Sequence, residues 1–246
     1  MNNIEKYVSL LPDKVVRNVE IVSAKELGQN YMLHIGSKKM PKTGYIPRIG
    51  QRQGTQEDRT TPRITVSSCL LGCFIGYGAA VWEAQDASAV ISSDDDFTQG
   101  YYIHSIPFDY CLKPTNRMVY DSTRSDEHWL VTYDEETKSY SSSVAGKMFI
   151  TDIGYKVLSD RPADAVMTLM VEISALDGIQ FSSKHYLKKG WYRITGPADV
   201  NTMSWLKDKD FQVVEISKGE FDAAKKVSAA MLCEDFKKQK PAFMTW

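Results

Sequence analysis

Short apolar segments with the patterning of β-strands recur along most of this sequence, and they limit the fold more than any other feature. The segment YMLHIGS covers residues 31–37, and in an extended chain its Leu33 and Ile35 share one side. His34 then projects from the opposite side. Further segments of this kind are GYYIHSI, EHWLVTY, KMFITDIGYKVL, VMTLMVEISAL, WYRITG and FQVVEIS. Because strands outnumber helices, we expect an α+β fold dominated by β-structure.

The segment PRITVSSCLLGCFIGYGAAV, residues 62–81, changes its period in the middle. Its first apolar residues alternate as in a strand, Ser67 or Ser68 is suited to cap a helix, and the later apolar residues recur at helical spacing. This pattern predicts a strand, a cap and a buried helix. The small residues Gly72 and Gly76 weaken the helix but allow it to lie close to a neighbouring element.

The length and composition suit a folded unit with a sizeable core. The chain has 246 residues, of which 43% are hydrophobic and 25% charged, as in ordinary globular proteins. We expect a main domain over residues 1–160 and a β-rich extension over residues 161–246, which ends in a helix from about Lys218 to Lys238 and packs on the first part. No apolar stretch approaches the roughly 20 residues of a membrane helix, and the N-terminus lacks the plan of a signal peptide. The sequence therefore predicts a soluble, cytoplasmic protein without membrane contact.

The charge of the chain is nearly balanced but unevenly distributed. The net charge of −1 argues against a dedicated nucleic-acid surface. Residues 1–68 nevertheless carry a net charge of +5, and residues 69–136 carry −9. Two interpretations stay open: a local basic region suited to an anion, or segments that intermix in the fold so that the asymmetry cancels. Nothing in the sequence indicates an oligomeric state.

Residues 38–61 form a polar segment rich in turn formers, and a loop of this length inside a compact domain is usually functional or disordered. The arginines in this segment and just beyond it are Arg48, Arg52, Arg59 and Arg63. Guanidinium groups bind phosphate or carboxylate through paired hydrogen bonds, so they indicate an anion site. The alternative for Arg63 is a surface ion pair with Glu57 or Asp58, worth about 0–1 kcal/mol.

Common catalytic and metal-binding motifs are missing from the sequence. It has no Walker loop and no GxGxxG, GxSxG or HExxH pattern, which anchor the usual nucleotide-binding, hydrolase and zinc-protease sites. The four cysteines lack the paired spacing of a zinc site, so no metal is expected. Any site is therefore made of residues that are dispersed along the chain.

A series of short motifs between residues 30 and 133 has a recognisable order. It runs from His34, Gly36 and Ser37 through PRI (47–49), ED (57–58) and PRITVSS (62–68) to DSTRSDEHWL (121–130). This order resembles a family of uncharacterised small proteins that are frequent in tailed phages, with the plan HxS, PRIP, ED, PRI-C-V-S and D-x-x-x-T-x-E-x-W. The sequence departs from that plan at Gly50, Thr65 and Ser125, where the plan has proline, cysteine and threonine.

The plan in turn looks like the ADP-ribosyltransferase fold, a split, mostly antiparallel β-sheet with a few packed helices that binds NAD. The resemblance implies NAD as substrate, with His34 on the adenosine-side ribose and Glu127 beside the other ribose as the catalytic residues. The other NAD-binding residues that it implies are Ser37 beside His34, Arg48, Arg52 or Arg63 on the pyrophosphate, and Ser67 and Tyr77 at the nicotinamide. Simpler interpretations stay open for three of these residues: His34 as a strand residue without a ligand, Glu127 in a solvated turn, and Ser67 as a helix cap only.

Two functions are consistent with these residues. The first is a phage-type ADP-ribosyltransferase-like enzyme that binds NAD or a related nucleotide and transfers ADP-ribose to, or otherwise inhibits, a host protein. An ionised carboxylate beside the ribose would stabilise the oxocarbenium-like state in which the N-glycosidic bond breaks. The alternative is a non-catalytic viral protein that inhibits a host defence or a host enzyme by binding protein or nucleotide directly. Ser125 favours this alternative, because many protein-modifying transferases carry a glutamate or glutamine two positions before the catalytic glutamate.

Overall fold

The computed structural model of the protein describes residues 2–36, 44–49, 57–76, 101–120, 122–133, 136, 138–155, 165–199, 204–205 and 211–225. Within these ranges eleven strands form one sheet. The strands are β1 (Val19–Ser23), β2 (Tyr31–Gly36), β3 (Ile64–Ser67), β4 (Tyr101–Pro107), β5 (Tyr110–Pro114), β6 (Glu127–Leu130), β7 (Ser143–Tyr155), β8 (Ala165–Ser182), β9 (His185–Asp199), β10 (Ser204–Trp205) and β11 (Gln212–Ile216). The helices are α1 (Asn3–Ser9), α2 (Asp13–Val16), α3 (Ala24–Leu27) and α5 (Ser122–Ser125), and residues 70–76 and 218–225 are also helical.

The strands follow the order β1-β5-β6-β3-β2-β4-β7-β8-β9-β10, with β11 also pairing with β9. Every pair of neighbouring strands is antiparallel. The mostly antiparallel α+β fold predicted from the sequence is therefore confirmed. The strand predicted in YMLHIGS is β2, and those in GYYIHSI and EHWLVTY are β4 and β6.

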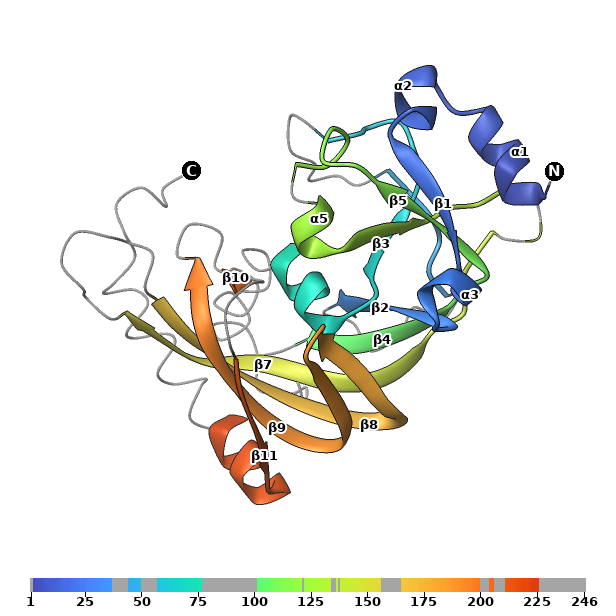
Figure 1. Ribbon diagram of the computed structural model, residues 1–246. Helices are drawn as coiled ribbons and strands as arrows, with labels where there is room; N and C mark the ends of the chain where they lie inside the picture. The colour runs from blue at the N-terminus through green and yellow to red at the C-terminus, as the bar shows by residue number, and fades with distance from the viewer. Residues whose placement is uncertain are drawn as a thin grey trace.

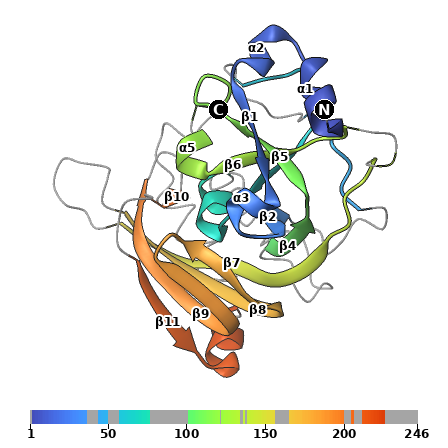
Figure 2. The same ribbon diagram turned by 45° about the vertical axis from the view of Figure 1, so that its right-hand side comes forward.

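The sheet is weakly joined between β2 and β3. These two strands share a single registered pair, Leu33 with Ser67, whereas β2 and β4 are paired along the whole length of β2. The strands β1, β5, β6 and β3 form an upper half that diverges from a lower half built by β7, β8 and β9 (Figures 1 and 2). The helical segment 70–76 lies between the two halves.

The largest core cluster lies between this helical segment and the lower half of the sheet. Leu70, Leu71 and Phe74 of the segment are almost fully buried against Leu33 and Ile35 of β2 and against apolar side chains of the later strands. The partners from the later strands include Ile150, Leu169, Val171 and Ile194. Residues 165–199 thus extend the same sheet and share its main core with the first part of the chain.

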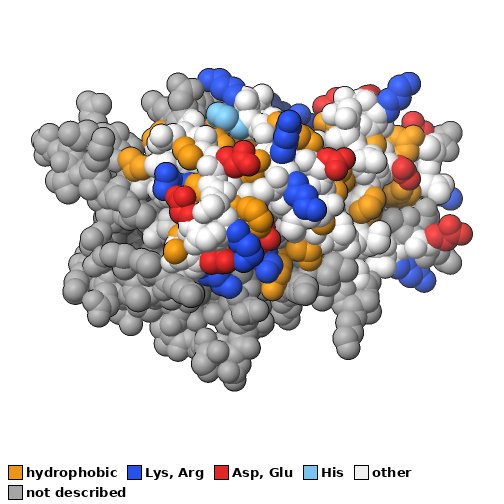
Figure 3. Space-filling view, turned by 90° about the horizontal axis from the view of Figure 1, so that it is seen from below, with side chains coloured by type: hydrophobic (Ala, Val, Ile, Leu, Met, Phe, Trp, Pro, Cys, Tyr) orange, Lys and Arg blue, Asp and Glu red, His pale blue; other side chains and the backbone are white. Residues whose placement is uncertain are grey.

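Charged side chains of both signs are intermixed on one face of the molecule (Figure 3). On the face seen from below, Lys and Arg side chains alternate with Asp and Glu side chains and with apolar ones (Figure 3). The C-terminal elements also contribute exposed ion pairs, Arg193 with Glu220 and Lys218 with Asp222. Among the helices of the described ranges, none combines the length and the apolar character that crossing a membrane requires.

Candidate functional site

A hollow opens between β3, the start of β6 and the helical segment 70–76. It has about 210 Å³ of empty space when the open solvent at its mouth is counted, and about 10 Å³ that the centre of a water-sized molecule can occupy. Its lining residues are Thr65, Val66, Ser67, Gly72, Cys73, Gly76, Ser125 and Glu127. Three residues that carry hydroxyl groups and one that carries a carboxylate therefore line a small, mostly apolar space.

Ser67 and Glu127, two of the residues proposed from the sequence, lie directly opposite each other across the antiparallel pair of β3 and β6. Residues paired in this way project from the same face of a sheet. Thr65 and Trp129 form the next pair of the same parity. The register of two short strands thus brings together residues that lie sixty positions apart along the sequence.

The Glu127 carboxylate is held by its neighbour on the strand. The Trp129 indole nitrogen Nε1 donates a hydrogen bond to Glu127 Oε1 over 2.6 Å. Glu127 is only 9% exposed, and Trp129 is fully buried. The interpretation of Glu127 as part of a solvated turn is therefore wrong, since the residue begins a buried strand and lines the hollow.

Ser67 is fixed from two sides. Its hydroxyl donates to Asp126 Oδ2 over 3.2 Å and accepts a hydrogen bond from the backbone N–H of Cys69 over 3.3 Å. Asp126 Oδ2 also accepts from the backbone N–H of Ser68 (3.0 Å) and from the Ser68 hydroxyl. Asp126 adopts a left-handed backbone conformation with φ of 51°, which is uncommon outside glycine and concentrates at functional turns. Asp126 therefore links β3 to the turn that presents Glu127.

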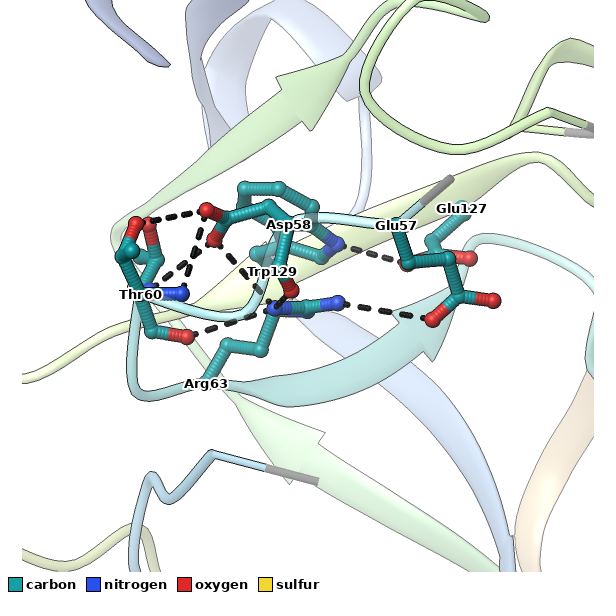
Figure 4. A network of polar contacts seen from close by, with 7 residues as sticks. Glu57, Asp58, Thr60, Arg63, Glu127 and Trp129 are labelled. Atoms are coloured by element: carbon teal, nitrogen blue, oxygen red, sulfur yellow. Dashed lines mark hydrogen bonds and ion pairs between the residues drawn. The ribbon is translucent and has the colours of Figure 1, made fainter. Parts of the chain in front are cut away.

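The Arg63 side chain forms its hydrogen bonds within the loop that precedes β3. Its Nη1 donates to the carbonyl oxygens of Asp58 (2.9 Å) and Thr61 (3.3 Å), and Nη2 lies 3.8 Å from Glu57 Oε2 (Figure 4). The guanidinium carbon lies 4.2 Å from the centroid of the Trp129 ring. The side chain of Arg63 is only 4% exposed, so the ion pair expected at the surface is buried. Arg63 does not line the hollow.

His34 projects from the other face of β2. Leu33, its neighbour, pairs with Ser67 and packs in the core beneath the helical segment, and alternation along the strand turns His34 away from that face. Its Nδ1 lies 2.9 Å from the Thr65 carbonyl oxygen, and its ring centroid lies 4.9 Å from that of Tyr45 and 6.4 Å from that of His104. His34 therefore supports β3 behind the hollow and does not line it.

Arg48 does not line the hollow. The backbone of Arg48 pairs with that of Arg63, and its charge helps to lower the pKa of His34. Ser37, Arg52 and Tyr77 lie outside the described residues. Within the described ranges, no three His, Cys, Asp or Glu side chains gather as the ligands of a metal ion would.

We expect Gly72 and Gly76 to respond differently to replacement by alanine. A Cβ at Gly72 would collide with the Ser67 hydroxyl and the Ser125 carbonyl oxygen, whereas a Cβ at Gly76 would find its nearest neighbour, Ser125 Cβ, at 3.6 Å. Gly72→Ala should destabilise the fold by about 1–3 kcal/mol through overpacking, while Gly76→Ala should be neutral or stabilising because alanine favours a helix. Urea unfolding of both variants measures the difference, and equal effects would contradict the close approach at Gly72.

The stability of the protein should fall in mild acid because of His34. Burial is the main cause that lowers the pKa of His34 from 6.5 to about 4. The unfolded chain therefore binds the proton more readily, so stability is complete above pH 6.5 and is lost as the pH falls toward 4. His34→Asn keeps a donor near the Thr65 carbonyl and removes the titrating group. The free energy of unfolding of this variant should therefore fall by less between pH 7 and 4.5, the difference being on the order of 2 kcal/mol. Urea midpoints at pH 7 and 4.5 test this, and equal declines in both proteins would refute it.

Trp129, Asp126 and Gly72 were not identified as functional residues from the sequence. The spacing of two between Glu127 and Trp129 was the available signal, because it places both side chains on one face of a strand. Comparison of the chain with protein-family models, with curated proteins and with solved structures found no match.

Proposed function

We propose that this chain is an ADP-ribosyltransferase-like enzyme that binds NAD or a related nucleotide at the hollow and transfers ADP-ribose to a host protein. The observation that supports this most is the pairing of Ser67 with Glu127 at one face of a small hollow. The strands that carry the three proposed motifs, β2, β3 and β6, are also neighbours in the sheet. This adjacency agrees with the order of the motifs in the sequence.

The chemistry assigned to Glu127 is stabilisation of charge. When the bond between ribose C1′ and the nicotinamide nitrogen breaks, the electron pair leaves with nicotinamide and positive charge develops on the ribose. A carboxylate in a site with little water stabilises this charge more strongly than it would in bulk solvent. A nucleophile of the acceptor then bonds to C1′ and releases its proton, which completes the transfer.

The size of the hollow limits what it holds. The space open to the centre of a water-sized molecule is about 10 Å³, which is room for about one water. The proposal therefore places the nicotinamide ribose of NAD at the mouth of the hollow, beside Glu127. Because the donors of Arg63 are directed to the loop, the proposal gives Arg63 no part in binding the pyrophosphate, and His34 acts as a support of β3.

The proposal is tested by incubating the purified chain with NAD and following nicotinamide release, and in parallel with labelled NAD and bacterial lysate. Release together with a labelled protein supports transfer, and release alone supports hydrolysis of NAD at the same site. Binding of NAD in calorimetry without either signal would favour the non-catalytic binding protein. Absence of binding, release and labelling would reject the nucleotide site.

A further inference from the structure

We propose that Arg63 is a positioning residue, which holds the Trp129 indole so that its N–H aims the Glu127 carboxylate at the hollow. The inference rests on the proposed function for its catalytic meaning, but its structural content concerns three side chains that are in contact in this chain. Arg63 lies beside the loop at residues 57–63 and contacts Trp129 in the core, and Trp129 in turn contacts Glu127 at the wall of the hollow (Figure 4).

The first step is the dependence of Glu127 on the orientation of one ring. The Glu127 side chain has three rotatable bonds, and Trp129 Nε1 donates to its Oε1 over 2.6 Å. An indole nitrogen is a donor only, and its N–H lies in the plane of the ring. A rotation of the ring therefore moves the donor, and the carboxylate moves with it or loses the bond.

The second step is the fixing of that ring. The guanidinium carbon of Arg63 lies 4.2 Å from the Trp129 centroid, which is within the range of a cation–π contact. Such a contact is strongest for a planar guanidinium laid over an indole in a site with little water. Trp129 is fully buried and the Arg63 side chain nearly so. The guanidinium therefore packs against one face of the Trp129 ring and restricts its rotation.

The third step is the anchoring of Arg63 itself. Asp58 and Thr61 accept hydrogen bonds from Nη1, and Glu57 faces Nη2 at 3.8 Å. Asp58 is in turn fixed by Thr60, whose hydroxyl donates to Asp58 Oδ1 over 2.6 Å. These oxygens come from one short segment, so its conformation sets the place of the guanidinium. The segment thus controls the geometry of Glu127 without touching a ligand in the hollow.

The test compares Arg63→Lys with Arg193→Lys in the full chain. Arg193 forms an exposed ion pair with Glu220, so its replacement by lysine is a matched change outside the site. The readout is the indole N–H of Trp129 in a nitrogen-15 spectrum, which is assigned by its loss in Trp129→Phe. Arg63→Lys should accelerate hydrogen exchange of this proton by about tenfold or more, and Arg193→Lys should leave the exchange unchanged.

With NAD as substrate, Arg63→Lys should lower kcat for nicotinamide release by about tenfold and change KM by less than about threefold, as expected for an effect on the reacting state alone.

If the unmodified chain releases no nicotinamide but the indole proton responds as described, the proposed function fails and the positioning role stands. If Arg63→Lys does not fold, Glu57→Gln is used in its place. Glu57 is the partly exposed partner of the Arg63 guanidinium, so this variant should also change the resonance and the exchange of the Trp129 indole proton. An indole proton that is unchanged in every folded variant overturns the inference.

Discussion

Replacing Glu127 with glutamine should lower the rate of nicotinamide release from NAD by about 10³-fold, because the amide cannot balance the positive charge that develops on the ribose. The shape of the side chain is retained, and its amide oxygen can still accept the hydrogen bond from Trp129 Nε1. Affinity for NAD should therefore fall by less than about tenfold, since the lost interaction belongs to the reacting state. Single-turnover release and calorimetric binding measure the two quantities separately.

Glu20→Gln provides the matched control for this experiment. Glu20 is an exposed residue of β1 at the other end of the upper half of the sheet, so its replacement removes the same charge outside the hollow. Its release rate should equal that of the unmodified protein. A Glu127→Gln protein that binds NAD and retains a third or more of the rate would show that the carboxylate does not stabilise the reacting ribose.

Replacing Arg63 with methionine should destabilise the fold by about 3–5 kcal/mol, because removal of one partner leaves a buried carboxylate without its counter-charge. The Asp58 side chain is 5% exposed and the Arg63 side chain 4%, so water cannot replace the lost interaction. The carbonyl oxygens of Asp58 and Thr61 also lose their donor. Thermal and urea unfolding at pH 7 measure the change.

Arg17→Met is the corresponding control at the surface. The pair of Arg17 with Asp13 has side chains that are 78% and 90% exposed, and such pairs contribute about 0–1 kcal/mol. The free energy of unfolding should therefore change little. Similar losses for both variants would mean that the burial of Arg63 contributes nothing to stability.

The strands could be predicted from the sequence because their patterns are local. The alternation in YMLHIGS and the polar entry to EHWLVTY gave β2 and β6, and the change of period after residue 67 gave the helical segment 70–76. The pairing of β1 with β5 was not predicted, because it joins residues about ninety positions apart and no local pattern encodes such a register.

The candidate site shows the same division between local and long-range information. Alternation correctly placed His34 opposite Leu33, but only the register of Leu33 with Ser67 shows that the hollow lies on the Leu33 face. The polar neighbours Asp126 and His128 favoured a solvated turn at Glu127. Pairing with β3 buries that turn instead, and this pairing depends on a segment sixty residues away.

The walls of the hollow come from two parts of the sheet that a single registered pair, Leu33 with Ser67, joins between β2 and β3. The glycine-bearing wall of the hollow belongs to the segment 70–76, which is packed on the lower half of the sheet, whereas Ser67 and Glu127 belong to the upper half. Contacts across this junction add to that pair, because His34 Nδ1 lies 2.9 Å from the Thr65 carbonyl oxygen and Gly72 approaches Ser67 and Ser125 closely. The width of the hollow therefore depends on side-chain packing across the junction and not on the strand ladder alone.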